Sequence, residues 1–265
     1  FCVLDSVRFF GLGRTMVFLS KVPLHAARFA HQKLNPLVFP MVHINEFPKS
    51  GGTWVCRMLR DVTGWRFDDN TMPLPGPAVV KYHRLPLSVR PLALIVRDPR
   101  DVLVSLFHHS RAVFEDDPFN STLVHAWREV FLRHDCESEQ LDAFVERQLT
   151  DPVYPRFAWS EFYEHFLSCG TPIFRYEDFR ANTAATLSSL LSGLGVKASA
   201  EAVERISEAH SIDKILAKRA ESGEAGASNF IRRGKVGGYA DALSPNAIAR
   251  IEQAEGSTMC KFGYL

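Results

Sequence analysis

Residues 46–55, with the sequence EFPKSGGTWV, have the residue types and the spacing of a phosphate cradle. They follow an apolar run at 41–45 and precede a helical pattern, so a strand, a tight turn and a helix start succeed one another. Glycines let backbone N–H groups turn inward, and the helix N-terminus adds partial positive charge. Lys49 adds a full charge, and the hydroxyls of Ser50 and Thr53 add donors. The alternative is an ordinary strand-to-helix turn with a solvated lysine.

The position of the lysine narrows the kind of phosphate ligand. Lys49 precedes Gly51 and Gly52, whereas the Walker pattern places its lysine after the glycines. An ordinary nucleoside-triphosphate loop therefore does not fit this sequence.

Five segments resemble, in their order along the chain, the motifs of the sulfotransferases that use 3′-phosphoadenosine 5′-phosphosulfate (PAPS). Residues 48–54 are similar to the family's 5′-phosphosulfate loop, and residues 79–86 are similar to the element that carries its catalytic histidine. Residues 94–105 resemble its 3′-phosphate segment, and residues 230–239 resemble its closing Arg-Lys-Gly loop. Residues 174–178 are a weaker match to its Tyr-Glu-Asp element. This order implies a PAPS-dependent sulfotransferase that acts on a hydroxyl group.

The resemblance implies a catalytic set of Lys49, Lys81, His83 and Ser105. His83 is implied as the general base for the acceptor hydroxyl, because a neutral imidazole accepts a proton near pH 7. Lys49 is implied to stabilise charge on the departing phosphate oxygen. Lys81 shares the strand face of His83 and is expected to reach the sulfonate. The alternatives are a structural histidine at a strand end and a solvated lysine at the edge of the sheet.

The resemblance also implies which residues bind the cofactor. Arginine forks match the geometry of phosphate groups, and aromatic rings are implied to stack on the adenine or lie at its edge. A surface charge or a core aromatic residue is the alternative at each such position. The implied contacts are Lys49, Ser50, Gly51, Gly52 and Thr53 for the 5′-phosphosulfate, Arg97, Ser105, Arg232, Arg233 and Gly234 for the 3′-phosphate, and Trp54 and Tyr176 for the adenine.

Several positions depart from the family pattern. Gly52 replaces a threonine of the loop, Tyr82 replaces a threonine beside the base, and Gly238-Tyr239 replaces Asp-Trp. None of these changes removes a charged catalytic group, so the sequence still predicts an active enzyme. The dimer motif of cytosolic animal members is absent from residues 239–252, which leaves the oligomeric state open.

Two other function classes remain open from the sequence. A nucleotide-dependent kinase on a P-loop-like fold would need a lysine after the glycines and acidic Mg²⁺ ligands, and the lysine is absent. A catalytically silent nucleotide-binding protein would be favoured by the loss of Lys49 or His83, and both are present.

Composition excludes some partners and favours one compartment. A formal net charge of +1 over 265 residues argues against a general nucleic-acid binder. The five cysteines include no C-x-x-C pair, which predicts a reduced, cytoplasmic protein without a disulfide framework or a metal site. The neighbouring His108 and His109 point to different faces of a helix, so a structural or surface role is expected.

Short apolar runs that alternate with helical patterns predict a single α/β domain with a central, mainly parallel sheet flanked by helices. Asp98-Pro99 predicts a capped helix start, and Gly256 is expected to end a helix that begins after Ser244. The expected strands are 41–45, 78–82, 92–96 and 172–175, and the other expected helices are 53–62 and 183–194.

The chain is expected to comprise a basic N-terminal helical segment, 1–40, and a sulfotransferase domain, 41–265. The basic and apolar residues of 1–40 predict either packing on the domain or peripheral contact with a membrane. The acceptor is expected to be a small molecule, glycan or lipid with a hydroxyl group. Aromatic residues in 114–163 are expected to line an acceptor pocket or to belong to the core.

Overall fold

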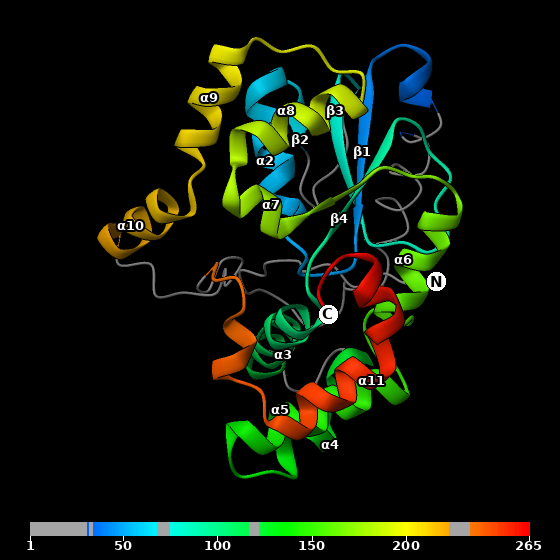
Figure 1. The fold of residues 1–265 in the computed structure, drawn as a ribbon, viewed down its shortest axis with the longest axis vertical. Helices are drawn as coiled ribbons and strands as arrows, with labels where there is room; N and C mark the ends of the chain where they lie inside the picture. The colour runs from blue at the N-terminus through cyan, green and yellow to red at the C-terminus, as the bar shows by residue number, and fades with distance from the viewer. Residues whose placement is uncertain (1–30, 32–33, 68–74, 117–121, 223–233) are drawn as a thin grey trace, which may run out of the picture.

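A parallel β-sheet forms the centre of the protein, with the strand order β2-β3-β1-β4-β5 (Figure 1). The computed structural model describes residue 31 and residues 34–67, 75–116, 122–222 and 234–265. The strands are β1 (Met41–Glu46), β2 (Arg66–Phe67), β3 (Ala78–Tyr82), β4 (Leu92–Val96) and β5 (Ile173–Arg175).

Helices connect the strands and extend the chain beyond the last of them. They are η1 (Asn35–Leu37), α2 (Gly52–Thr63), α3 (Pro99–Asp116), α4 (Thr122–Leu132), α5 (Glu137–Thr150), α6 (Trp159–Ser168), α7 (Tyr176–Ala181), α8 (Thr183–Gly193), α9 (Ala200–Ala209), α10 (Ile212–Ser222), η2 (Gly238–Asp241) and α11 (Pro245–Lys261). The single α/β domain with a parallel sheet that the sequence predicts is therefore confirmed.

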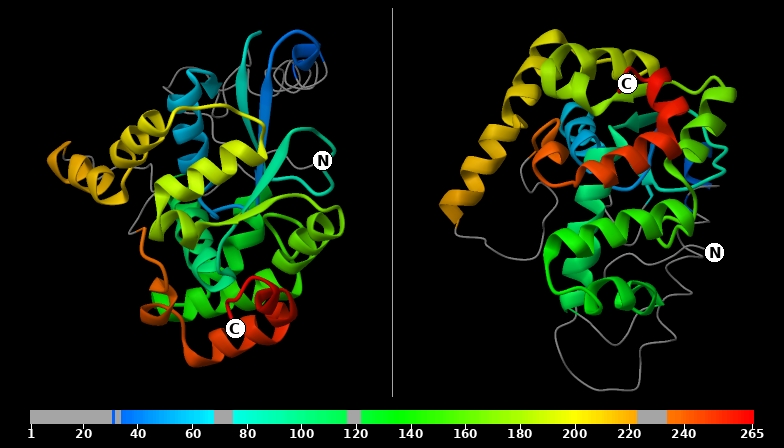
Figure 2. Two further views of the ribbon diagram at one scale, coloured as in Figure 1. Left: turned by 45° about the horizontal axis from the view of Figure 1, so that its top comes forward. Right: turned by 60° about the horizontal axis from the view of Figure 1, so that its bottom comes forward.

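Helices cover both faces of the sheet and create two apolar clusters. Because successive strand residues point to opposite faces, Ala93 and Ile95 pack with α2, α7, α8 and α9, whereas Leu94 and Val96 pack with α3 to α6 and α11. Burial on both faces explains why β4 is a continuous apolar run and does not alternate. Figure 2 shows these two helix groups from two further directions and α10 reaching beyond the rest of the molecule.

Four strands end at the same edge of the sheet. The register pairs Asn45 of β1 with Tyr82 of β3, and Val96 of β4 with Arg175 of β5. The residues that follow these strands therefore meet at the carboxyl edge, where ligands bind in parallel α/β folds.

The predicted elements agree closely with those of the structure. β3 and β4 have the predicted bounds, β1 is one residue longer, and β5 begins one residue later than predicted. Helix α3 begins at Pro99, and Asp98 Oδ1 accepts the Arg100 N–H over 2.9 Å, so the predicted helix start is confirmed. The short strand β2 was not predicted, because two residues carry no periodicity.

The predicted end of the last helix is wrong. Helix α11 continues through Gly256 to Lys261, because Thr258 and Met259 of the added turn are buried. A glycine inside a helix costs only about 1 kcal/mol relative to alanine, which the burial of Met259 exceeds.

The N-terminal segment predicted for residues 1–40 lies mostly outside the described residues, which include only residue 31 and residues 34–40 of it. Within the described part of the chain, no helix has both the length and the apolar character needed to cross a bilayer.

Candidate active site

The turn between β1 and α2 has a backbone that only certain residues adopt. Gly51, the N-cap of α2, has a φ of 101°, and a Cβ there would lie 2.7 Å from Cδ2 of Tyr176. Lys49 has a φ of 75° and is the one non-glycine residue with positive φ among those described. Such a conformation is costly and typical of functional loops. It places Lys49 and the first N–H groups of α2 at the carboxyl edge of the sheet.

Tyr163 of α6 supports this turn from the core. Its buried hydroxyl donates to the Ile95 carbonyl oxygen over 2.7 Å and accepts the Phe47 N–H over 3.4 Å. The Ser50 hydroxyl lies 3.2 Å from the same oxygen and is itself fully buried. Because the Tyr163 proton is directed to Ile95, Ser50 is the donor in that pair. The structure therefore places the Ser50 hydroxyl in the support of the turn.

Cations converge on the turn. Lys81 Nζ donates to Thr53 Oγ1 over 2.6 Å, which connects β3 to the first turn of α2. The pKa of Lys49 is lowered to about 8, first by burial and then by the charges of Lys81 and Arg97, while Glu46 opposes this shift. Positive groups held this close repel one another, so the site favours a bound anion.

His83 directly follows β3, and the structure fixes its tautomer. Its Nδ1 lies 3.0 Å from the backbone carbonyl oxygen of Glu46, which can only accept, so Nδ1 carries the proton and Nε2 keeps a lone pair. Burial, then the charge of Lys81, lowers the pKa of His83 to about 3. The imidazole is therefore neutral near pH 7, with an unprotonated Nε2.

Asn45 holds the chain just beyond His83. Its side chain donates to the Arg84 carbonyl oxygen over 2.8 Å and accepts the Arg84 N–H over 3.1 Å. Asn45 is completely buried, so this pair of bonds fixes the exit of the chain from β3. The position of His83 thus depends on β1 as well as on β3.

Arg97 follows β4, and its guanidinium makes several contacts at this edge of the sheet. Its guanidinium lies 4.5 Å from the ring centroid of Tyr176 and 3.4 Å from the Asp101 carboxylate. Longer hydrogen bonds reach the carbonyl oxygens of Lys49 at 3.5 Å and Lys235 at 3.3 Å. Its buried Nε has no hydrogen-bond partner among the described residues. A buried, unsatisfied guanidinium donor is costly, and an oxyanion would satisfy it.

Asp101 attaches a distant turn to this edge of the sheet. Its carboxylate accepts the N–H groups of Gly237 and Tyr239, each over 2.9 Å. The Tyr176 hydroxyl donates to the Gly234 carbonyl oxygen over 3.3 Å. Gly234 therefore lies beside the Arg97–Tyr176 pair. The neighbouring Arg232 and Arg233, predicted as phosphate ligands, lie outside the described residues.

The two aromatic residues predicted to contact the adenine, Trp54 of α2 and Tyr176 of α7, pack against each other. The ring centroids of Trp54 and Tyr176 are 5.9 Å apart in an edge-to-face arrangement. Trp54 Nε1 donates to the His210 carbonyl oxygen over 2.9 Å, so its indole is anchored in the core. Tyr176 joins this group to Gly51 and Arg97.

The structure brings most of the predicted residues together at one edge of the sheet. Lys49, Gly51, Gly52, Thr53 and Lys81 surround the turn, with His83, Arg97, Tyr176 and Gly234 beside it. Ser105 is half-buried on α3, two turns after Arg97, and no described hydrogen bond joins the two.

Sequence reasoning missed several residues of this site. His109 was expected to have a structural or surface role, but its pKa is lowered to about 4, first by burial and then by the charges of Lys49 and Lys81. It therefore lies within electrostatic reach of the cradle. Its spacing of four from Ser105, one helical turn, is the signal that could have identified it. The other missed residues are Asn45, Glu46, Asp101 and Tyr163.

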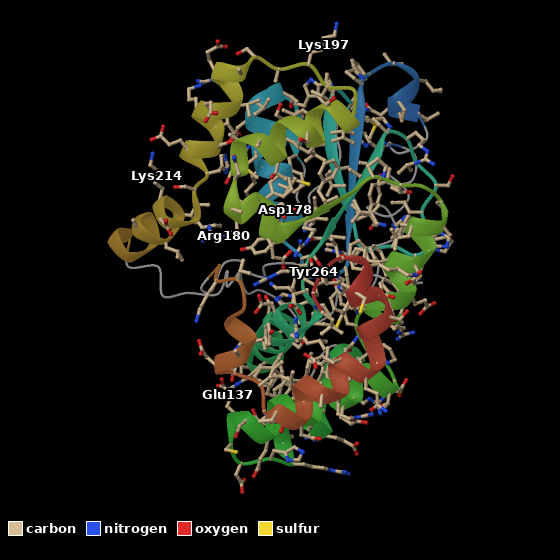
Figure 3. All side chains as sticks on the ribbon, in the orientation of Figure 1. Glu137, Asp178, Arg180, Lys197, Lys214 and Tyr264 are labelled. Atoms are coloured by element: carbon tan, nitrogen blue, oxygen red, sulfur yellow. The ribbon has the colours of Figure 1, made fainter. Side chains whose placement is uncertain are left out.

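Besides Arg97, the described residues include two arginines with a buried, unsatisfied Nε, Arg175 and Arg180. Arg180 follows Tyr176 by one helical turn on α7, and its charge acts on the Tyr176 hydroxyl. Figure 3 labels Arg180 and Asp178 on α7, with Tyr264 of the C-terminal segment lower in the same view.

The aromatic residues of 114–163 belong mainly to the core. Trp127, Phe131 and Trp159 are buried in the cluster below the sheet, and Tyr154 and Phe157 are partly buried against it. Core packing is thus the reading that the structure favours for this group.

Comparison of the chain with known proteins identifies its family. A family model, described as the sulfotransferase domain, matches residues 74–263 of this chain. The matched range begins after the Lys49 turn. No curated protein sequence matches the chain.

Solved structures share the fold at low sequence identity. A mouse sulfotransferase, SULT7A1, complexed with PAP is 17% identical, with 83% of this chain and 84% of that chain covered and a TM-score of 0.61. Retinol dehydratase with androsterone and the inactive cofactor PAP is 16% identical, with coverage of 88% and 85% and a TM-score of 0.61. Retinol dehydratase with retinol and PAP is 18% identical, with coverage of 88% and 86% and a TM-score of 0.58. Because the family model spans most of the chain, this protein belongs to the sulfotransferase family.

Proposed function

We propose that this protein transfers the sulfuryl group of PAPS to a hydroxyl group of an acceptor. The observation that carries the proposal is the arrangement of Lys49, Lys81 and Arg97 around the α2 N-terminus, next to the neutral His83. Membership of the sulfotransferase family and the PAP named in the neighbouring structures support the same cofactor.

The residues present fit PAPS at both of its charged ends. Lys49, Lys81 and Thr53 would hold the 5′-phosphosulfate at the α2 N-terminus, where backbone N–H groups and the helix dipole favour anions. Arg97, with its unsatisfied Nε, would hold the 3′-phosphate. Ser105, Arg232, Arg233 and the Gly234 backbone are proposed as its further ligands, and Trp54 and Tyr176 as neighbours of the adenine.

Each catalytic side chain has a definite proposed task. PAPS supplies an activated sulfuryl group, and transfer depends on in-line positioning and charge stabilisation, as in phosphoryl transfer. His83 accepts the proton of the acceptor hydroxyl at Nε2, while its Nδ1–H stays bonded to the Glu46 carbonyl. Lys49 stabilises the departing phosphate oxygen, and Lys81 balances charge on the sulfonate.

The proposed acceptor is a small hydroxyl compound, with a glycan or a lipid as the wider class. Two of the neighbouring structures hold androsterone or retinol, and both compounds carry a hydroxyl group. The charges of Lys49 and Lys81 act on His109, which makes it a further candidate for a polar contact with such an acceptor.

A transfer assay tests the catalytic part of this proposal. Purified protein is incubated in EDTA with radiolabelled PAPS and panels of phenols, aliphatic alcohols, monosaccharides and lipid alcohols, and labelled products are separated. The wild type should sulfate one class, and His83→Ala should lose at least about a hundredfold in kcat, as expected for a general base. His134→Ala, at a half-exposed histidine outside the site, should leave kcat unchanged. Equal activity in His83→Ala and the wild type would refute the assignment of the base.

A further inference from the structure

The Glu46 carboxylate lies at the same helix N-terminus that the proposed function assigns to the 5′-phosphosulfate. Glu46 is the last residue of β1 and is only 2% exposed. Its carboxylate accepts the N–H of Gly52, the first residue of α2. That N–H is one of the donors that a helix cannot satisfy internally, and it is therefore available to an anion.

Gly52 is the residue that makes room for this carboxylate. A Cβ on Gly52 would lie 2.6 Å from Glu46 Cδ and 2.8 and 2.9 Å from its two oxygens. Both carboxylate oxygens thus occupy space that any other residue at position 52 would fill. The two residues form a matched pair, in which the absence of a side chain at 52 admits the acidic side chain of 46.

The charge of Glu46 acts on the cofactor lysine. The charge of Glu46 opposes the lowered pKa of Lys49, so it partly neutralises the cationic group proposed to stabilise the departing phosphate oxygen. A phosphate group at the α2 N-terminus would meet this carboxylate at close range, and two anions there repel each other.

We propose that Glu46 is an internal anion of the cradle: it competes with the 5′-phosphate group of the cofactor for the Gly52 N–H and for Lys49. Glu46 thereby weakens the binding of PAPS and of its product, 3′-phosphoadenosine 5′-phosphate (PAP), and favours product release. This inference rests on the proposed function, because it concerns the same site.

The test compares two nucleotides that differ only at the 5′ position. PAP and adenosine 3′-monophosphate, which lacks the 5′-phosphate, are titrated calorimetrically into the wild type, Glu46→Gln and Glu255→Gln. Glu255 is a matched control, since it is a buried glutamate that accepts an N–H at the start of another helix, from Ser160 of α6 over 2.8 Å. Glu46→Gln keeps the size of the side chain and removes its charge.

Glu46→Gln should bind PAP at least about tenfold more tightly than the wild type, because the charge repulsion is removed. Its affinity for adenosine 3′-monophosphate should not change, and Glu255→Gln should behave as the wild type with both ligands. Glu46→Ala carries the same expectation and replaces Glu46→Gln if that variant does not fold.

Other outcomes overturn the inference. If the wild type binds PAP and Glu46→Gln binds it equally or more weakly, Glu46 only supports the turn. If both nucleotides bind more tightly to the variant, the effect is not competition at the 5′ end. If no protein binds PAP, the proposed function itself fails, and this inference fails with it.

Discussion

At the scale of single residues, Lys49 connects the electrostatics of the site to a measurable pH dependence. Its pKa of about 8 means that the free protein loses this positive charge as the pH rises through 8. A bound phosphate raises the pKa of Lys49, so binding takes up a proton above pH 8 and becomes weaker there.

The affinity for PAP should therefore be nearly constant between about pH 7 and 7.5 and fall by up to about tenfold per unit above pH 8. The phosphates stay ionised throughout this range, because their second pKa is about 6. Calorimetric titration from pH 7 to 9.5 measures the effect. Lys49→Met should bind PAP more weakly and without this slope, and a wild-type affinity that is flat up to pH 9.5 would exclude the assignment of Lys49.

Gly52 and Glu46 should depend on each other in their effect on stability. Gly52→Ala alone forces the Glu46 carboxylate to move and should cost about 1–3 kcal/mol of the free energy of unfolding, as overpacking does. In a Glu46→Ala background the same change should be neutral or stabilising by up to about 1 kcal/mol, because alanine favours a helix.

Urea unfolding of the two single variants and the double variant completes this cycle. The predicted interaction energy between positions 46 and 52 is the difference between the effect of Gly52→Ala in the wild type and its effect in the Glu46→Ala background. Additive effects would show that the close approach of Gly52 to Glu46 has no energetic weight.

At the scale of elements, the turn at 237–239 is attached to α3 by one carboxylate. Asp101→Ala leaves the N–H groups of Gly237 and Tyr239 without this acceptor, and each lost, partly buried bond to the carboxylate costs about 1–3 kcal/mol. Hydrogen exchange at these two amides should accelerate in the variant, whereas the amides of β1 should change much less.

Asp241→Ala is the control for this prediction, since its ion pair with Lys235 is more than half exposed on both sides. Such a pair contributes about 0–1 kcal/mol, so exchange at Gly237 and Tyr239 should stay close to that of the wild type. Equal protection in Asp101→Ala and the wild type would mean that other contacts hold the turn.

The elements also show what a sequence can and cannot predict here. The bounds of β3 and β4 could be predicted from local apolar runs, and the start of α3 from Asp98-Pro99, because these signals depend only on neighbouring residues. The continuation of α11 past Gly256 depends on burial of Met259 against other helices, which no local pattern contains.

In the candidate site too, residues with local sequence signals could be predicted, whereas contacts that depend on the folded chain could not. Residues directly after strands, such as His83 and Arg97, could be predicted, because parallel strands bring their carboxyl ends together. The contact of Glu46 with Gly52 could not, because it depends on the positive φ of the intervening turn. The spacing of four between Ser105 and His109 was a usable signal, but only the structure shows that this face of α3 brings His109 within reach of the charges of Lys49 and Lys81.

At the scale of the whole molecule, Tyr163 joins the core to the cradle. Tyr163→Phe removes the hydroxyl that serves Ile95, Ser50 and Phe47, and should lower the free energy of unfolding by about 1–3 kcal/mol. It should also weaken PAP binding, because the turn loses its support. Thermal unfolding with and without PAP separates the two effects.

Tyr264→Phe is a matched control for Tyr163→Phe. It removes a hydroxyl that donates to Glu177 over 2.8 Å, and Glu177 lies on α7 and not in the turn between β1 and α2. This variant should lose stability and keep the PAP affinity of the wild type. If Tyr163→Phe also keeps that affinity, the turn does not depend on α6.

The central claim is that the protein binds the nucleotide of PAPS through the carboxyl edge of its sheet. The most direct measurement is calorimetric titration of PAP, in EDTA, into the wild type, Arg97→Ala and the surface variant Arg133→Ala. We predict micromolar binding by the wild type and by Arg133→Ala, and a loss of at least about tenfold in Arg97→Ala, which removes a charge-assisted phosphate contact. No PAP binding by the wild type, together with binding of ATP and Mg²⁺, would contradict the account.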